Sequence, residues 1–393
     1  MKENYRIIEV NDNRTRKEFL NLPVRLYKDE PNWIRPLDED IEKVFDPSQN
    51  KFFRHGEAVR WLLVDDNDKT VGRVAAFYDR KTAKSYEQPT GGMGFFECIN
   101  DKKAAFVLFD QCKQWLENKG MEAMDGPVNF GDRDRWWGLL VDGFGYPPNY
   151  CMTYNFPYYK ELFEEYGFKN FFNQYTYYRA IKKEGLSPVI EEKAKRLKQN
   201  PLYHFEHLKK NNIEKYIEDF RSIYNRAWSR YSGVKEITTG HARALMKSLK
   251  PVLDERIMWF GYYGEDPIAF FLMVPDANQI VKNLNGKLDL LGKLKFVFHK
   301  KFNPPNKVLG LIFGIVPEHQ GRGVEGGLVI SFSEIALKDG FPYKHLELNW
   351  IGDFNPAMMK VAEQIGGQIL KTHVTYRYLF DRTKPFKRMK KVS

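Results

Sequence analysis

Residues 308–340 contain the feature that most limits how this chain can fold. A nine-residue apolar run, VLGLIFGIV (308–316), stops at Pro317, and a polar turn with Gly321 and Gly323 leads into the amphipathic run GGLVISFSEIALKDG (326–340). The pattern predicts a strand, a glycine-rich turn and a helix. Such a turn exposes the unpaired N–H groups of the first helical turn, which form an anion site. The motif is neither a P-loop, which needs G-K-[ST], nor the dinucleotide fingerprint GxGxxG.

The order of predicted elements occurs twice along the chain. Residues 158–181 and 357–380 align without gaps, and each segment predicts a glycine-terminated helix followed by an alternating strand. The first half predicts strands at 5–10, 58–66, 70–79, 92–99 and 121–128, helices at 12–27, 38–45, 102–120 and 156–166, and final strands. The second half predicts strands at 203–209, 256–263, 267–274, 308–316 and 344–350, helices at 213–228, 237–253, 326–340 and 355–365, and final strands. We therefore expect an α/β protein of two similar domains, each a mixed central sheet flanked by helices.

The domain boundaries follow from this repeat and from charge. We expect a first domain at 1–182, a charged linker at 183–201 that is helical in its middle, a second domain at 202–381 and a basic tail at 382–393. The net charge of +11 favours anionic partners. The three cysteines lack metal-ligand spacing, so we expect no metal and a reducing, cytoplasmic environment. No apolar run is long enough to span a bilayer, and no secretory signal is expected.

The stretch VPEHQGRGVEGGL resembles the acyl-CoA loop of the GNAT superfamily of N-acyltransferases, whose form is Q/R-x-x-G-x-G/A. The resemblance covers residues 203–381 and implies an acyl-CoA or acetyl-CoA cosubstrate and direct attack of an amine on a thioester. The residues implied to bind the cosubstrate are Ile315, Val316, Gln320, Gly321, Arg322, Gly323, Val324, Glu325 and the helix-opening Asn355. The first half has no glycine at the equivalent place, FFECINDKKAAF, so we expect a degenerate domain that does not bind CoA.

Glu325 departs from the loop pattern. A carboxylate there would repel a pyrophosphate if it faced the site, but at a helix N-terminus it could instead interact favourably with the dipole and turn outward. Both orientations stay open at the level of sequence.

Amine acylation needs a base, donors for the oxyanion and an acid for the thiolate. The tyrosine that many relatives use as the acid is replaced by Ala362, and Tyr376 is a substitute unless it belongs to the core. Glu347 is the predicted base, because His345, Glu347 and Asn349 give one strand a polar face; the alternative is a solvated edge carboxylate. His319, beside the loop, is a second candidate unless it is merely exposed.

The segment GPVNFGDRDRWWGLLVDGF (126–144) mixes charges with large aromatic residues, a composition common in binding loops. We expect it to hold the acceptor amine; the alternative is a structural loop with Asp–Arg bridges. The candidate residues are Asn129, Asp132, Arg133, Arg135, Trp136 and Trp137.

Residues 278–302 interrupt the second half with leucines at helical spacing among lysines. The members of this pattern are Leu284, Leu288, Leu291, Leu294 and Phe298, with Lys282, Lys287, Lys293 and Lys295. Such an insert could contact an anionic membrane, which would place a cytoplasmic protein peripherally on the inner membrane, or it could close over an acyl chain. Alternatively, its apolar side packs on the domain.

Four short motifs narrow the resemblance further. NxxFFxH (Asn50, Phe52, Phe53, His55), GPxNF, HQGRG and NGKL together resemble the bacterial ceramide synthase type of tandem GNAT protein. That type implies N-acylation of a long-chain sphingoid-type base from a CoA or acyl-carrier-protein thioester. Two alternatives remain: a Fem-like aminoacyl or peptidyl transferase, and a non-catalytic protein that binds nucleic acid or membrane. Nucleic acid is unlikely as a partner because helix-turn-helix and zinc-finger patterns are missing from the sequence.

Overall fold

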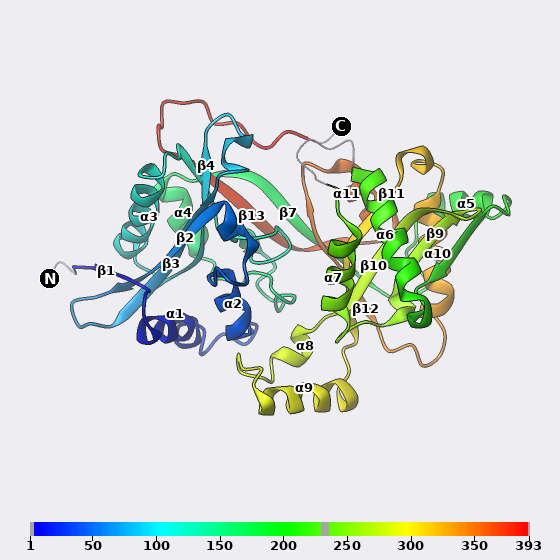
Figure 1. Ribbon diagram of the computed structural model, residues 1–393, viewed down its shortest axis with the longest axis horizontal. Coiled ribbons are helices and arrows are strands. Elements are labelled where there is room, and N and C mark those ends of the chain that lie inside the picture. The colour runs from blue at the N-terminus through cyan, green and yellow to red at the C-terminus, as the bar shows by residue number, and fades with distance from the viewer. Residues whose placement is uncertain (1–3, 229–235, 392–393) are drawn as a thin grey trace.

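The computed structural model describes residues 4–228 and 236–391, which form two lobes on one continuous mixed sheet (Figure 1). The strands follow the order β1-β2-β3-β4-β5-β13-β7-β12-β11-β10-β9-β8, and β6 pairs with β13.

The first half of the chain builds the first lobe. Its elements are β1 (Arg6–Glu9), α1 (Asn13–Leu26), α2 (Asp38–Val44), β2 (Gly56–Val64), β3 (Thr70–Asp79), β4 (Thr90–Cys98), α3 (Lys102–Glu117), β5 (Ala123–Gly126), β6 (Leu139–Asp142), α4 (Tyr159–Tyr166) and β7 (Lys169–Ala180).

The second half builds the second lobe. It begins with α5 (Pro188–Leu197), inside the predicted linker, and continues with β8 (Tyr203–His207), α6 (Ile213–Trp228), α7 (Thr239–Leu249), β9 (Met258–Tyr263), β10 (Asp266–Pro275), α8 (Asn278–Val281), α9 (Leu290–Phe302), β11 (Lys307–Ile315), α10 (Val324–Ala336), β12 (His345–Gly352), α11 (Pro356–Gln364) and β13 (Gln368–Leu379).

The last strand of each half crosses to the other lobe. β7 pairs with β12 of the second half, and β13 pairs with β5 of the first half, so the two long strands lie antiparallel at the centre of the sheet (Figure 1). Tyr376 and Tyr378 of β13 accordingly belong to the first core, and Tyr177 of β7 to the second. The predicted boundaries remain a proposed division of the sequence, because in space the halves are interlocked by these strands.

Each lobe contains one parallel strand pair beside a bulge. β4 and β5 pair from Thr90↔Ala123 to Gly92↔Asp125, and β11 and β12 pair from Lys307↔His345 to Gly310↔Leu348. A register shift in β4 lies opposite Arg73/Ala75, and one in β11 lies opposite Leu272/Met273. Because bulges bend a strand and end regular pairing, each lobe has a place where its parallel strands can separate.

The insert at 278–302 differs from the single amphipathic helix implied by the leucine spacing. It consists of two helices, α8 and α9, with Gly286 between them at a φ of +76°. Leu284 is buried, whereas Leu291, Leu294 and Phe298 are exposed. In the described residues no helix has both the length and the apolar character needed to cross a membrane.

Candidate active site

The parallel pair of the second lobe opens beyond Gly310 and Leu348. β11 continues to Ile315 and β12 to Gly352, past their last mutual pair. Leu311 is 42% exposed, and Phe313 and Asn349 are half-buried, although these strands lie inside a wide sheet. The two strands therefore no longer pair beyond this point, and we call the region where they separate the cleft; Leu311 is exposed there.

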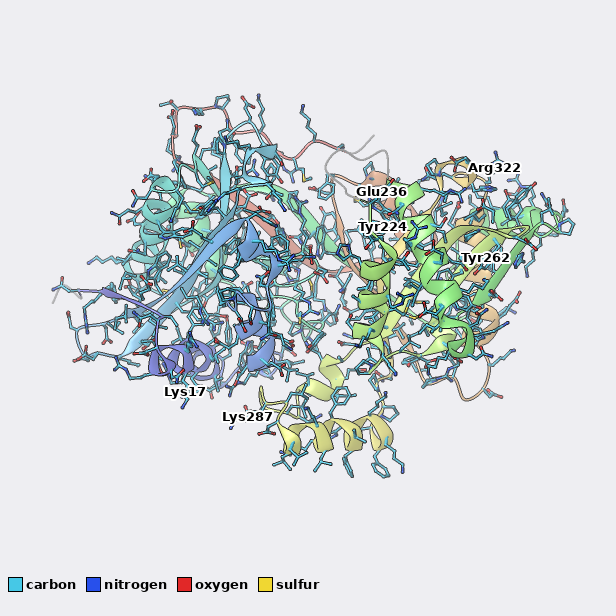
Figure 2. All side chains as sticks on the ribbon, viewed as in Figure 1. Lys17, Tyr224, Glu236, Tyr262, Lys287 and Arg322 are labelled. Carbon is cyan, nitrogen blue, oxygen red and sulfur yellow. The ribbon has the colours of Figure 1, made fainter. Side chains whose placement is uncertain are left out.

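The glycine loop follows directly from β11. Gly321 and Gly323 have φ values of +73° and +94°, which only glycine adopts readily. Gln320, Gly321 and Arg322 are exposed (Figure 2), and no other atom of the described residues would lie within 4 Å of a Cβ at Gly321. Gly323 is the N-cap of α10, and no side chain in the described part of the chain caps this end. The first N–H groups of α10 thus lack a side-chain partner among the described residues, although Gly323 itself is buried beside Lys193 of α5. Uncapped N–H groups at the start of a helix are the kind that hold an anion.

Buried apolar residues hold this loop at both ends. Ile315, Val316 and Val324 are buried, and the Gln320 amide nitrogen Nε2 donates to the Ile315 carbonyl oxygen at 3.0 Å. Asn355, the remaining residue implied for the cosubstrate, caps α11 by accepting from the Met358 N–H at 3.2 Å. These contacts indicate that Ile315, Val316, Gln320, Val324 and Asn355 shape the loop and its neighbouring helix.

Glu325 neither faces the loop opening nor turns outward. It is buried and forms an ion pair with Lys193 of α5 at 3.2 Å. α5 packs tightly here because Gly326 is small: a Cβ at Gly326 would lie 2.8 Å from the Ile190 carbonyl oxygen. Neither of the two orientations that the sequence left open is found: the Glu325 carboxylate is buried, and Lys193, from a helix of the predicted linker, neutralises its charge.

A buried cluster of four charges lies where the parallel strands of the second lobe begin, since Lys307 is the first residue of β11 and Glu347 the third of β12. The Glu347 carboxylate binds the Lys307 and Lys371 ammonium groups at 2.9 Å each, and Lys307 also binds Asp276 at 3.0 Å. The Asn149 amide, from the first half, donates to Glu347 Oε2 at 2.8 Å. All five side chains are buried.

The protonation of this cluster follows from competition between burial and charge. Burial alone would raise the pKa of Glu347, but Lys371 and Lys307 outweigh it and hold the pKa below its usual value. Burial lowers the pKa of Lys371 despite its carboxylate partner. An ionised, fully paired carboxylate is a weak proton acceptor. The role of Glu347 as base therefore stays a prediction, and its contacts favour a role in holding the two halves together.

The other two predicted catalytic residues lie away from the cleft. His319 is buried beside Tyr203 and Tyr263 of β8 and β9, and its Nδ1 lies 2.9 Å from the Tyr203 hydroxyl oxygen. Burial, with Arg322 nearby, lowers its pKa. Tyr376 is buried in the first core and donates to Glu164 of α4 at 2.8 Å. Strand exchange explains this position, since β13 pairs with β5, and it argues against Tyr376 as the acid.

The predicted acceptor residues divide into three groups. Asn129 and Trp136 are buried, Trp137 is half-buried, and Asp132, Arg133 and Arg135 are exposed. Trp136 belongs to the wall of a cavity in the first lobe, with Phe95 and Met152. Arg133 reaches the second lobe, because its carbonyl oxygen accepts from the Trp350 indole nitrogen at 3.1 Å. The segment therefore contacts the part of β12 that lies beyond the parallel pairing.

Several buried polar residues that are candidates for the functional site were not predicted from the sequence. Lys371, His373, Thr375 and Arg377 alternate along β13 and are all buried. The motif KTHVTYR shows this polar alternation, which would normally indicate a solvated face. His373 Nε2 lies 3.0 Å from the Thr153 carbonyl oxygen, and its Nδ1 has no hydrogen-bond partner among the described residues; burial lowers the pKa of His373 to about 4. Asn149, Lys307 and Asp276 gave no local signal.

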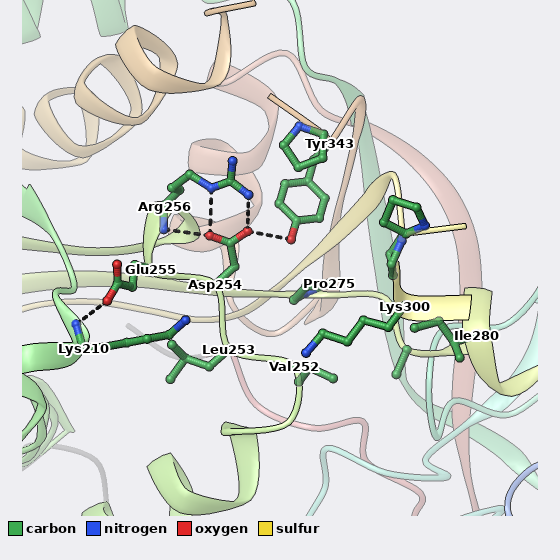
Figure 3. A pocket seen from close by; sticks show the side chains of 14 residues that line it. Lys210, Val252, Leu253, Asp254, Glu255, Arg256, Pro275, Ile280, Lys300 and Tyr343 are labelled. Carbon is green, nitrogen blue, oxygen red and sulfur yellow. Dashed lines mark hydrogen bonds and ion pairs between the residues drawn. The ribbon is translucent and has the colours of Figure 1, made fainter. Parts of the chain in front are cut away.

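A separate cavity lies at the amino ends of β11 and β12. Its wall includes Val252, Ile280, Lys300 and Tyr343 (Figure 3). Asp254 in this cavity is already bound by Arg256 and by the Tyr343 hydroxyl, so its charge is satisfied. The glycine loop lies at the carboxyl end of β11, so this cavity is separate from the cleft. Over the described ranges, no cluster of histidine, cysteine and carboxylate side chains could hold a metal ion.

No family model matches the chain. Its structure resembles a tandem GNAT protein from the clavulanic acid biosynthesis pathway, with a TM-score of 0.55 and 10% identity over 97% of this chain and all of that one. A GCN5-related N-acetyltransferase from Sphaerobacter thermophilus gives a TM-score of 0.51 and 9% identity over 98% of both chains. A glucosamine N-acetyltransferase region in a fungal multi-domain β-N-acetylglucosaminidase gives 0.56 and 10% over 96% of this chain and 38% of that one. The predicted fold is confirmed: the chain has the tandem GNAT fold.

Two relatives match nearly the whole sequence. The chain is similar to the bacterial ceramide synthase of Caulobacter vibrioides, with 28% identity over 375 residues, which are 94% of this chain and 96% of the relative. It is also similar to protein YghO of Escherichia coli, with 24% identity over 363 residues and 92% of each chain. The resemblance inferred from the motifs is confirmed, and these comparisons together support an acyltransferase of the GNAT type.

Proposed function

We propose that the protein transfers an acyl group from a CoA thioester, or from an acyl carrier protein, to the primary amine of a long-chain sphingoid-type base. One observation carries this proposal: β11 and β12 separate beyond Gly310 and Leu348, and β11 leads into a glycine loop at a helix N-terminus that no side chain of the described residues caps. A GNAT cosubstrate needs both features, an anion site for the pyrophosphate and a neighbouring slot between separated strands.

The chain's own residues have distinct tasks in this proposal. Gly321, Gly323 and the first N–H groups of α10 hold the pyrophosphate. Leu311 and Phe313 offer apolar contact inside the cleft, which suits an acyl chain. Glu347 stays our candidate for proton transfer, either directly or by positioning Asn149, whose amide also donates to Asn349 at 3.1 Å.

The first lobe supplies the acceptor side in this proposal. Two of its segments contact β12 near the cleft, through the Arg133 carbonyl with Trp350 and through Asn149 with Asn349. We propose that residues 129–137 guide the amine to the cleft from there. The long-chain character of the acceptor rests on similarity to a relative named ceramide synthase. We place the protein in the cytoplasm; contact with an anionic membrane has separate grounds, given below.

Product analysis tests the proposal. The full-length protein is incubated with a long-chain acyl-CoA and a long-chain amino alcohol, and mass spectrometry detects the amide. The matched control is Gly323→Asp, which should lose the product because the new carboxylate repels phosphate and the left-handed backbone disfavours a side chain. Amide formation from aminoacyl-tRNA but not from acyl-CoA would support a Fem-like transferase instead, and equal product from Gly323→Asp would remove the loop from the reaction.

A further inference from the structure

The apolar face of α9 points away from the protein. Leu290, Leu294, Phe298 and Phe302 recur every four residues and therefore form one stripe along the helix. With Leu291 and Val297 beside them, these side chains are between 54% and 78% exposed. A surface helix normally turns such a stripe toward the core. Figure 1 shows α9 at the edge of the molecule, below α8 and away from the central sheet.

The inner side of α9 is fixed to the protein. Gly292 is buried, and Phe296 packs with Leu37, Val281 and Leu284 in a small core shared by both halves. The Asp38 N–H donates to the Gly286 carbonyl oxygen at 2.8 Å, and the Asn278 amide donates to the Pro148 carbonyl oxygen at 2.8 Å. The apolar stripe is therefore held outward by contacts on its opposite side.

The fold of the second lobe does not require this insert. β10 and β11 are antiparallel neighbours, and Pro275 already pairs with Val308. A hairpin turn of a few residues would connect them. Residues 276–306 instead project α9 from the end of this pair, at the opposite end of the second lobe from Arg322 (Figure 2).

The charges around the apolar stripe indicate what kind of surface it binds. The insert carries six exposed lysines and one aspartate, Asp289. No ion pair among the described residues uses any of these lysines, which are Lys282, Lys287, Lys293, Lys295, Lys300 and Lys301. Lys300 differs from the others, because it belongs to the wall of the cavity in Figure 3 and its ammonium group donates to the Pro251 carbonyl oxygen at 2.6 Å. An apolar stripe bordered by unpaired lysines matches the boundary between acyl chains and anionic headgroups. Lys301, which lies within the stripe, is long enough to extend its ammonium group to that boundary.

A second copy of the chain fits less well. A helix of 13 residues is about 20 Å long and offers a few hundred Å², whereas a specific interface buries about 800 Å² per partner. Like-charged lysines would also face each other across such a dimer.

We propose that α9 docks the protein on an anionic bilayer by inserting the stripe Leu290–Leu294–Phe298–Phe302 among the lipid headgroups. This docking does not depend on the proposed acyl transfer and can be measured without substrate. It adds a lipid surface as a partner and orients the second lobe relative to it.

Vesicle cosedimentation of the full-length protein is the first test, with phosphatidylcholine vesicles that contain or lack phosphatidylglycerol. Binding should require phosphatidylglycerol and weaken with salt. Leu294→Ser combined with Phe298→Ser should reduce binding about ten-fold or more, as should replacing Lys293, Lys295 and Lys301 by glutamine. The matched controls are Leu245→Ser and Lys338→Gln, exposed residues on α7 and just after α10, which should leave binding unchanged. Undiminished binding by both α9 variants overturns the proposal.

A fluorescent label locates the contact directly. The native thiols Cys98, Cys112 and Cys151 are buried, so a polarity-sensitive dye should react selectively with Val297→Cys. Its emission should shift to the blue when anionic vesicles are added, whereas the same dye on Leu245→Cys should not respond. A shift that appears with rising protein concentration and without vesicles would assign the stripe to a second copy and contradict membrane docking.

Discussion

The two strand–loop–helix units of this protein differ at the start of their helices. The N-cap residue of α3 is Asp101, whose carboxylate accepts from the Ala104 N–H at 2.7 Å. The N-cap residue of α10 is Gly323, which has no side chain that could accept such a hydrogen bond. Both units follow a strand with a bulge that has a parallel neighbour. A protein side chain thus occupies in the first lobe the place that is open to a ligand in the second.

The side chains at the bulges beside these helices also differ between the two lobes. In the first lobe Phe95 packs against Trp136 and Phe19, and Glu97 beside it accepts from two buried tyrosine hydroxyls, Tyr27 and Tyr159. Burial raises the pKa of Glu97 although Arg73 opposes this. In the second lobe Leu311 remains exposed. The comparison teaches that one topology can bring very different side chains to the bulge: aromatic rings and a buried carboxylate line a cavity in the first lobe, whereas Leu311 is exposed in the second.

The largest expected effect concerns the buried charge cluster around Glu347. Glu347→Gln should cost about 3–5 kcal/mol of unfolding free energy, because it leaves Lys371 and Lys307 buried with too little negative charge. Urea unfolding measures this. The control is Glu334→Gln, whose exposed pair with Lys198 should be worth about 1 kcal/mol or less.

Acid should act on the same site. The folded pKa of Glu347 is lowered, so its stabilisation is complete above about pH 4.5, the unfolded value, and is lost as the pH falls through the folded pKa. If Glu347→Gln keeps its stability and instead loses the acidic limb of the rate profile, Glu347 is the base.

The next effect tests the open loop itself. Gly321→Asp should weaken acyl-CoA binding by about ten- to a hundred-fold, because a carboxylate is added beside the pyrophosphate site. Gly321→Asn is the matched control: it has a similar shape, tolerates the left-handed backbone and adds no charge, so we expect it to bind within about three-fold of the native protein. Calorimetric titration compares the two. Equal binding by both variants would place the pyrophosphate elsewhere.

A smaller effect is expected at the capped helix. Asp101→Ala should cost about 1 kcal/mol of stability, the usual value of a lost N-cap, and should leave acyl-CoA binding unchanged. Thermal unfolding and the same titration measure the two quantities. A second acyl-CoA site appearing in this variant would show that the cap alone keeps the first lobe inactive.

The smallest effect concerns the charge pair behind the loop. Lys193→Gln should weaken acyl-CoA binding by a few-fold, because it removes a cation and leaves the Glu325 charge uncompensated near the anion site. Glu325→Gln in the same chain should restore binding. If the single variant binds normally, the pair only joins α5 to α10.

Short-range patterns predicted most of the fold. The order of strands and helices, the helix within residues 183–201 and the N-cap at Asn355 all follow from periodicity, capping residues and glycine, which act within a few residues. The glycine loop, of which Gln320, Gly321 and Arg322 are exposed, was also predicted from sequence, since its pattern is local.

The candidate site was harder to predict where it depends on distant partners. Glu347 was singled out from the polar face of its strand, but its two lysines and Asn149 come from three other segments. Tyr376 was a candidate acid unless it belonged to the core, and the crossing of β13 places it in the first core. No local pattern encodes which lobe a final strand joins.

The sequence by itself determined that the chain alternates strands and helices twice, that only its second half has the glycine loop, and that the insert is both apolar and basic. Tertiary structure alone decided that the last strands exchange lobes, that Lys193 neutralises Glu325, and that the stripe of α9 faces outward. The reason is physical: periodicity fixes which side chains share a face, whereas the contacts of that face depend on segments that meet only when the whole sheet assembles.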